Sequence, residues 1–206
     1  MLKVWGRRNS INVQKVMWAV GELSLAHEHI DAGGPFGGLD TDEFAALNPN
    51  RRVPVIDDDG TVVWESNAIV RYISAKHGYG TLYPAFVQAR ADAERWMDWC
   101  TSTLAASMTP LFWQLVRTPE DKRDAVLVEE ARTQCERLFR IADAALANRP
   151  WIAGSVFTMG DIPLGCFAWR WKALPLERPA LAHLDAWQER LATRAAFRRN
   201  VMLPLS

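Results

Sequence analysis

One short stretch divides the sequence, "GYGTLYPAF" at residues 78–86. Before it, short β-branched runs alternate with runs whose apolar residues recur at helical spacing. After it the strand patterns disappear, and helical patterns follow at about residues 86–116, 120–146, 159–171 and 179–193. Glycines beside a proline are typical of a linker between folding units. The sequence therefore predicts an α/β domain over residues 1–79 and an all-helical domain over residues 86–206.

The sequence pattern of the first domain predicts a small β-sheet with helices between and after its strands. Strands are expected at "LKVW", "HEHIDA", "VPVID" and "TVVWE", and the last two are joined by "DDG", a hairpin sequence. Helices are expected to begin after Ser10, at Asp40 or Thr41, and at Ser66 as the N-cap. The predicted order is a β-α-β unit followed by a β-β-α unit.

The charge of the chain is balanced, with 24 basic and 24 acidic residues. No long run of one sign could neutralise a line of phosphates, so neither nucleic acid nor a membrane surface is an expected partner. No stretch reaches the roughly 18 apolar residues of a membrane span, and the first residues lack the order of a secretory signal. A cytoplasmic protein is expected. Three widely spaced cysteines and four dispersed histidines predict a reduced compartment and no metal site.

Ser10 stands between the first strand and the first helix, in "GRRNSINVQKVMW". Its hydroxyl, or the side chain of Asn9, could cap the helix by accepting a hydrogen bond from an early backbone N–H. The hydroxyl could instead face a ligand. The local sequence alone favours the cap, because Ser and Asn are enriched at that position for this reason.

A second candidate site combines "NRRVPVID" with "WESN". Pro54 opens a strand, and the peptide bond before it is a candidate for the cis form, which would free the backbone of Val53 to pair with an extended peptide. A ligand-free edge proline is an equal alternative. Glu65 and Ser66 lie at a helix N-terminus, whose free N–H groups favour an anion. Together they could hold the carboxylate and ammonium of an α-amino acid head group.

The chain resembles the bacterial cytosolic glutathione S-transferases, close to their serine-type theta-like branch. The similarity lies in "NSINVQKV", "NPNRRVPVID", "WESNAIVRYIS" and "FTMGDI", and it covers essentially the whole chain. It implies the glutathione transferase fold, a thioredoxin-like N-terminal domain followed by an all-helical domain. It also implies glutathione as co-substrate, no metal, a homodimer and a role in detoxification.

The resemblance implies that Arg52, Val53, Pro54, Glu65 and Ser66 bind glutathione. In this family the Val-Pro bond is cis, the residue before the proline pairs with the cysteinyl backbone, and the Glu-Ser pair holds the γ-glutamyl end. Arg52 is expected near the glycine carboxylate, with Arg51 as the alternative and a solvent-exposed role open for either.

The resemblance also implies that the Ser10 hydroxyl faces a ligand, because a tripeptide bound along the strand that begins at Pro54 would bring its thiol to the loop after the first strand. Lowering a thiol pKa of about 8.5 by roughly two units takes about 2.7 kcal/mol, which a hydrogen bond and the positive helix end can supply. The first tyrosine is Tyr72 and the first cysteine is Cys100, so neither a tyrosine-type nor a cysteine-type site can form in this loop. Ser10 is therefore the expected catalytic residue, and Asn12, or less readily Asn9, could share or replace its role.

The resemblance places the second substrate between the first loop and the helical domain. Candidates for the wall of this electrophile pocket are Met108, Phe112, Trp113 and Trp169. Each is more often a packing residue, because most of the 10 tryptophans must lie in the core. Thr158 and Asp161 match the N-capping box of the family, which serves folding and lies outside the predicted site.

Transfer of glutathione to small hydrophobic electrophiles is the predicted function. Glutathione-dependent peroxidase, dehalogenase or isomerase chemistry on one metabolite is an alternative with the same thiolate. The fold also serves as a non-catalytic binding module in relatives of this family. The combination of Ser10, Pro54, Glu65 and Ser66 argues against the module, because a pure scaffold needs no thiol or γ-glutamyl contacts.

Overall fold

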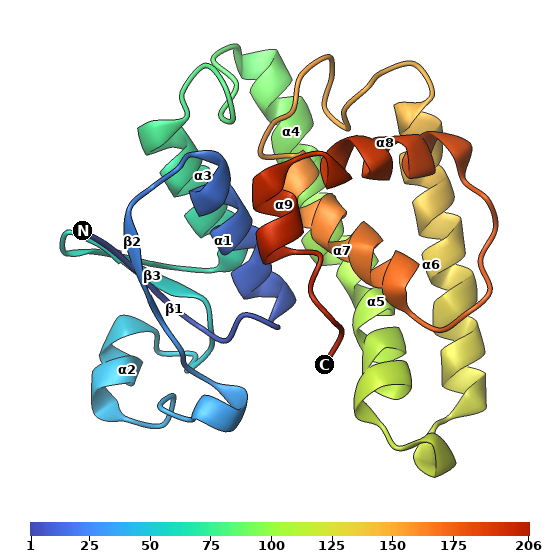
Figure 1. The fold of residues 1–206 in the computed structure, drawn as a ribbon, viewed down its shortest axis with the longest axis horizontal. Coiled ribbons are helices and arrows are strands. Elements are labelled where there is room, and N and C mark those ends of the chain that lie inside the picture. The colour runs from blue at the N-terminus through green and yellow to red at the C-terminus, as the bar shows by residue number, and fades with distance from the viewer.

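The computed structural model describes residues 1–206, with a small α/β domain beside a larger helical domain (Figure 1). The sheet has the strand order β2-β1-β3-β4. Its strands are β1 (Leu2–Trp5), β2 (His27–Ile30), β3 (Val55–Asp58) and β4 (Thr61–Trp64). β1 pairs in parallel with β2 and antiparallel with β3, and β3 and β4 form the predicted hairpin. The thioredoxin-like order predicted from the sequence is confirmed.

Helices cover both faces of the sheet. α1 (Ile11–Glu22) and α3 (Ser66–His77) lie side by side between the strands and the helical domain, and α2 (Asp42–Leu47) lies on the other side (Figure 1). Successive residues of β3 face opposite sides of the sheet. Ile56 belongs to the main core, and Val55 packs with Phe44 of α2. Thr41, one of the two predicted caps, accepts a hydrogen bond from Phe44 N at 3.2 Å.

The prediction that Ser66 caps α3 is wrong by one residue. Ser66 is the first helical residue, and Glu65 holds the N-cap position with a left-handed backbone, φ 69°. A non-glycine residue adopts this conformation only where its surroundings impose it. α3 thus begins at Ser66, and both the Ser66 side chain and the strained Glu65 lie at the domain interface.

The first helix of the second domain is a continuous rod with two π-helical segments. α4 (Val87–Trp99) runs through Cys100–Leu104 into α5 (Ala105–Phe112), which runs into a second π-helical segment, Trp113–Arg117. The patterns predicted one helix here and did not predict the π turns, which are often found at functional sites.

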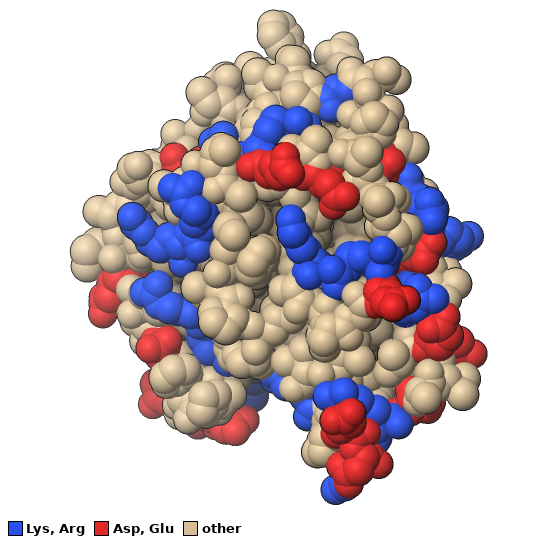
Figure 2. All heavy atoms as spheres, turned by 45° about the vertical axis from the view of Figure 1, so that its right-hand side comes forward, with Lys and Arg blue, Asp and Glu red and all other residues tan.

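Four more helices complete the domain: α6 (Ala125–Leu146), α7 (Asp161–Ala173), α8 (Ala182–Ala192) and α9 (Ala195–Asn200). α9 was not predicted from the sequence. α6 begins later than expected because Asp124 caps it, accepting hydrogen bonds from Val126 N at 3.0 Å and Leu127 N at 3.1 Å. None of the helices is long and apolar enough to cross a membrane. On the face shown in Figure 2, basic and acidic side chains are intermixed.

α7 lies in the middle of the helical domain and packs directly on α1 (Figure 1). A Cβ at Gly165 would lie 2.7 Å from the Trp18 ring, so only glycine permits this approach. At the end of α1, Glu22 pairs with Arg194 at 2.7 Å and accepts a hydrogen bond from Trp18 Nε1 at 2.8 Å. These contacts fix the C-terminal end of α1 to the helical domain.

Thr158 and Asp161 form side-chain hydrogen bonds of the predicted box in the turn before α7, although the N-cap position of the helix is Gly160. Asp161 Oδ2 accepts a hydrogen bond from Thr158 N at 3.0 Å, and Thr158 Oγ1 accepts one from Gly160 N at 3.3 Å. The other carboxylate oxygen of Asp161 accepts from Ile152 N and from Trp187 Nε1, both at 2.9 Å. Asp161 therefore joins the start of α7 to two other parts of the domain.

Candidate functional site

Two cavities meet at the domain interface beside the N-termini of α1 and α3. The smaller has a volume of about 100 Å³ and is lined by Asn12, Asn48, Arg52, Val53, Pro54, Glu65 and Ser66. The larger, of about 320 Å³, lies between α1, α3 and the helical domain and shares Asn12, Glu65 and Ser66. A third cavity, also of about 320 Å³, lies at the far end of α1, where Glu22 and Arg194 neutralise each other. The two joined cavities are the candidate site.

All five residues predicted to bind glutathione line the smaller cavity. The Val53-Pro54 peptide bond is cis, as expected, and neither the N–H nor the carbonyl of Val53 forms a hydrogen bond within the chain. Asn48 supports this turn by donating to Arg52 O at 2.8 Å. The Arg51 guanidinium turns away, donating to Leu39 O and Thr41 O, both at 3.2 Å.

A buried lysine joins the two predicted halves of the site. Lys15 Nζ donates to Asn12 Oδ1 at 3.0 Å, and Ser66 Oγ donates to the same oxygen at 3.3 Å. Because the oxygen accepts both hydrogen bonds, the NH₂ group of the Asn12 amide faces the other way, as a donor. α1 and α3 are thus connected through one side-chain amide.

Lys15 was not singled out from the sequence. Its residue is only 2% exposed, no carboxylate lies within ion-pair distance of it, and its ammonium lies 5.2 Å from the centre of the Phe167 ring. Burial lowers the pKa of Lys15 below its ordinary value. Its spacing from Ile11 and Asn12, four and three residues, could have indicated a shared helix face.

Ser10 occupies the N-cap position of α1 with an extended backbone, φ −76° and ψ 124°, and is 9% exposed. Its hydroxyl makes neither a cap hydrogen bond nor any other within the chain, so the interpretation that it caps α1 is wrong. Asn9 does not cap the helix either, because its Oδ1 is buried without a hydrogen-bond partner, while its Nδ2 donates to Ser206 Oγ at 2.7 Å. Gly6, earlier in the loop, admits no side chain, because a Cβ would lie 2.4 Å from Val13. Ser10 itself lines neither cavity.

The four candidates for the electrophile pocket lie outside the two joined cavities. Met108 and Phe112 are buried, Trp113 is 54% exposed, and Trp169 donates from Nε1 to Leu203 O at 3.2 Å. None of them lines either of the two joined cavities. Their role in a pocket stays a prediction.

The comparisons with known proteins agree with this geometry. Residues 1–75 match the family model of the glutathione S-transferase N-terminal domain, and residues 104–195 match that of the C-terminal domain. Glutathione S-transferase GstB of Escherichia coli (strain K12) is 39% identical over 208 residues, with 100% of both chains covered. The chain belongs to the glutathione S-transferase family.

Further relatives within the glutathione S-transferase family support the same assignment. Glutathione S-transferase 3 of Zea mays is 33% identical, over 97% of this chain and 93% of that protein. The theta class glutathione S-transferase of Xanthomonas axonopodis pv. citri, with glutathione bound, has a TM-score of 0.96 and 50% identity, covering 100% of this chain and 99% of that one. The predicted family, its theta-like bacterial branch and its fold are confirmed.

None of the cysteines of this glutathione S-transferase is activated as a nucleophile, although Cys100 and Cys166 lie near the charge of Lys15. Cys100, Cys135 and Cys166 are free and buried. Burial raises the pKa of Cys135 and of Cys166 to about 12, so both are thiols at neutral pH. No three His, Cys, Asp or Glu side chains lie close enough together to hold a metal ion.

Proposed function

We propose that this member of the glutathione S-transferase family transfers glutathione to small hydrophobic electrophiles, with Ser10 stabilising the thiolate. The observation that carries the proposal is the small cavity with the cis Val53-Pro54 bond, Glu65 and Ser66 at one end of α1. The solved Xanthomonas relative, half of whose aligned residues are identical, binds glutathione.

In the proposed arrangement, different residues of the site bind each part of glutathione. The free backbone of Val53 pairs with the cysteinyl residue, and Arg52 attracts the glycine carboxylate. The Ser66 N–H and the Asn12 amide donate to the γ-glutamyl carboxylate, whose neighbouring ammonium faces Glu65. Asn12 thereby acts at the γ-glutamyl end, and Ser10, with an uncommitted hydroxyl, is the donor to sulfur.

The proposed reaction needs no covalent enzyme intermediate. The bound thiol loses its proton to solvent, and the thiolate sulfur attacks the electrophilic carbon. A carbon–sulfur bond forms while the leaving group departs with its electron pair. Met108, Phe112, Trp113 and Trp169 are the proposed neighbours of the electrophile on the side of the helical domain.

Calorimetric titration with glutathione, followed by thiolate absorbance across pH, tests the proposal. We expect saturable binding and a bound-thiol pKa about two units below its usual value of about 8.5. A protein that fails to bind glutathione would be a non-catalytic module of the same fold. Turnover of hydroperoxides, but of no alkyl or aryl halide, would favour the peroxidase alternative.

Lys15→Met is expected to weaken glutathione binding about tenfold. Without the ammonium, only the Ser66 hydroxyl holds the Asn12 oxygen, so the NH₂ group is oriented less firmly toward the γ-glutamyl carboxylate, and a positive charge beside the site is lost. Titration calorimetry measures the change, and Lys15→Arg should restore most of the affinity. The melting temperature should not fall, because a buried ammonium without a carboxylate partner contributes little to stability. Unchanged affinity in Lys15→Met would contradict the proposed orientation of Asn12.

We also propose a cytoplasmic homodimer, as the resemblance implies. Multi-angle light scattering is expected to give twice the 23.3 kDa mass of the chain. A mass of one chain at micromolar concentration would contradict the dimer.

A further inference from the structure

Three arginines around the loop before Ser10 have no Asp or Glu partner. Arg7 lies in that loop, Arg117 ends the second π-helical segment and Arg170 lies on α7. None of the three takes part in an ion pair, although other arginines of the chain do. We call these three residues the arginine cluster.

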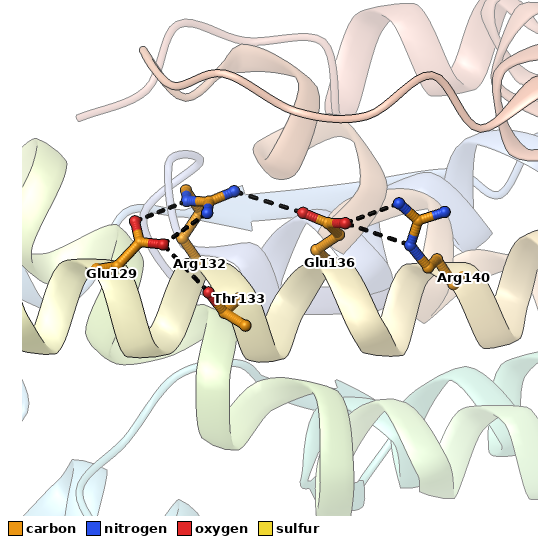
Figure 3. A network of polar contacts seen from close by, with 5 residues as sticks. All are labelled: Glu129, Arg132, Thr133, Glu136 and Arg140. Atoms are coloured by element: carbon orange, nitrogen blue, oxygen red, sulfur yellow. Dashed lines mark hydrogen bonds and ion pairs between the residues drawn. The ribbon is translucent and has the colours of Figure 1, made fainter.

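The surface of α6 shows how this chain neutralises arginines elsewhere (Figure 3). Arg132 lies between Glu129, at 2.6 Å, and Glu136, at 3.4 Å, and Arg140 lies 2.7 Å from Glu136. Every guanidinium in that network faces a carboxylate. The arginine cluster is the opposite case, because none of its guanidiniums faces an Asp or Glu side chain.

Arg170 is the most deeply buried member, at 9% exposure. Its guanidinium donates to Asn9 O at 3.1 Å and lies 4.1 Å from the centre of the Phe112 ring. Its Nε is buried and has no hydrogen-bond partner. The contact with Asn9 places this charge next to the residue that precedes Ser10.

Arg117 meets the same aromatic ring from another direction. Its guanidinium lies 5.6 Å from the centre of Phe112 and 5.4 Å from that of Trp113. It donates to the main-chain oxygen of Ser206 at 2.7 Å, and its Nε is also buried without a partner. Arg7 makes no side-chain hydrogen bond, and its side chain packs against Gly34.

The three charges are close enough to repel one another. Burial lowers the pKa of Arg170 to about 10, and repulsion from Arg117 and Arg7 adds to this lowering. Burial, and after it the charge of Arg117, lowers the pKa of Arg7. Three like charges with no Asp or Glu side chain among them create a positive field that attracts anions, and buried donors without partners are groups that a ligand can satisfy.

We infer that the electrophile carries a carboxylate or a similarly compact anionic group, which the arginine cluster binds while Phe112 and Trp113 contact its apolar body. The inference rests on the proposed glutathione transfer and names the class of its second substrate. Guanidinium groups suit this task because they bind carboxylates through paired, charge-assisted hydrogen bonds. The substrate oxygen would share Arg117 with the Ser206 oxygen or replace it.

Two glutathione conjugates that differ by one charge provide the test, S-(4-carboxybenzyl)glutathione and S-(4-carbamoylbenzyl)glutathione. In calorimetric titrations, the wild-type protein is expected to bind the carboxylate about tenfold more tightly than the amide. Arg117→Gln, and separately Arg7→Gln, should remove most of this preference and leave amide binding within about twofold. Both positions are only partly buried, so neither substitution is expected to prevent folding.

Arg132→Gln is the matched control, because it changes the net charge equally but lies in the neutralised network of α6. It should keep the full preference for the carboxylate. Equal binding of the two conjugates by the wild-type protein would overturn the inference and leave glutathione transfer intact, as would a preference that survives in both cluster variants. If glutathione and both conjugates fail to bind, the proposed function itself is wrong.

Discussion

Replacing Ser10 with alanine is expected to raise the pKa of bound glutathione from about 6.5 toward about 8.5, with the positive end of α1 retaining part of the lowering. If the whole shift were lost, the thiolate fraction at pH 7 would fall from about three quarters to about three per cent, so kcat should fall by up to about 25-fold. Above about pH 9 both proteins hold the thiolate, and their rates should converge. Thiolate absorbance and the pH profile of kcat measure the two effects independently.

The same substitution should leave the fold unchanged, because the Ser10 hydroxyl makes no cap hydrogen bond in α1. Loss of a working Ser cap costs about 1 kcal/mol, whereas here we expect less than about 0.5 kcal/mol in thermal unfolding. Ser10→Thr, which retains the hydroxyl, is the control for the chemistry. An equal thiol pKa in wild type and Ser10→Ala would exclude Ser10 as the donor and move attention to Asn12.

Asp161→Ala is expected to give the largest loss of stability, about 3–5 kcal/mol in the free energy of unfolding. The carboxylate is fully buried and accepts three hydrogen bonds, from Thr158 N, Ile152 N and Trp187 Nε1. Its removal leaves three buried N–H donors without an acceptor, each at a cost of about 1–3 kcal/mol. Denaturant unfolding measures the change.

The folded fraction of Asp161→Ala should keep the glutathione affinity of the wild type, because Asp161 lines neither site cavity. Asp161→Asn retains one acceptor oxygen and should lose less stability. Wild-type stability in Asp161→Ala, or a selective loss of glutathione affinity, would show that the role of this residue is different.

The sequence predicted the sheet, the hairpin and most helices, because each depends on periodicity or on turn chemistry within a few residues. It failed where a distant segment decides the outcome. A polar residue on one face of α1 indicates exposure, yet α7 covers Lys15 through Phe167. A Glu-Ser pair before a helix indicates a serine cap, but Glu65 takes that position in a conformation that no local pattern reveals. The short α9 had no apolar repeat long enough to be recognised.

The candidate site was predictable only as two separate motifs. The resemblance implied the roles of Val53, Pro54, Glu65 and Ser66, and their meeting in one cavity depends on the packing of α3 against β3 and α1. The arginine cluster had no counterpart in the sequence, because its members are separated by 110 and 53 positions along the chain. The absence of Asp and Glu side chains around these arginines can be recognised only when all of their neighbours in the fold are known.

The left-handed backbone of Glu65 has a consequence for engineering this protein. Glycine adopts φ 69° freely, so Glu65→Gly would relieve about 1 kcal/mol of strain. A library screened for heat resistance alone would therefore enrich glycine at position 65 and discard the carboxylate proposed to hold the substrate ammonium. At position 65, selection for thermal stability and selection for catalytic activity favour different residues, so a useful screen must test both properties.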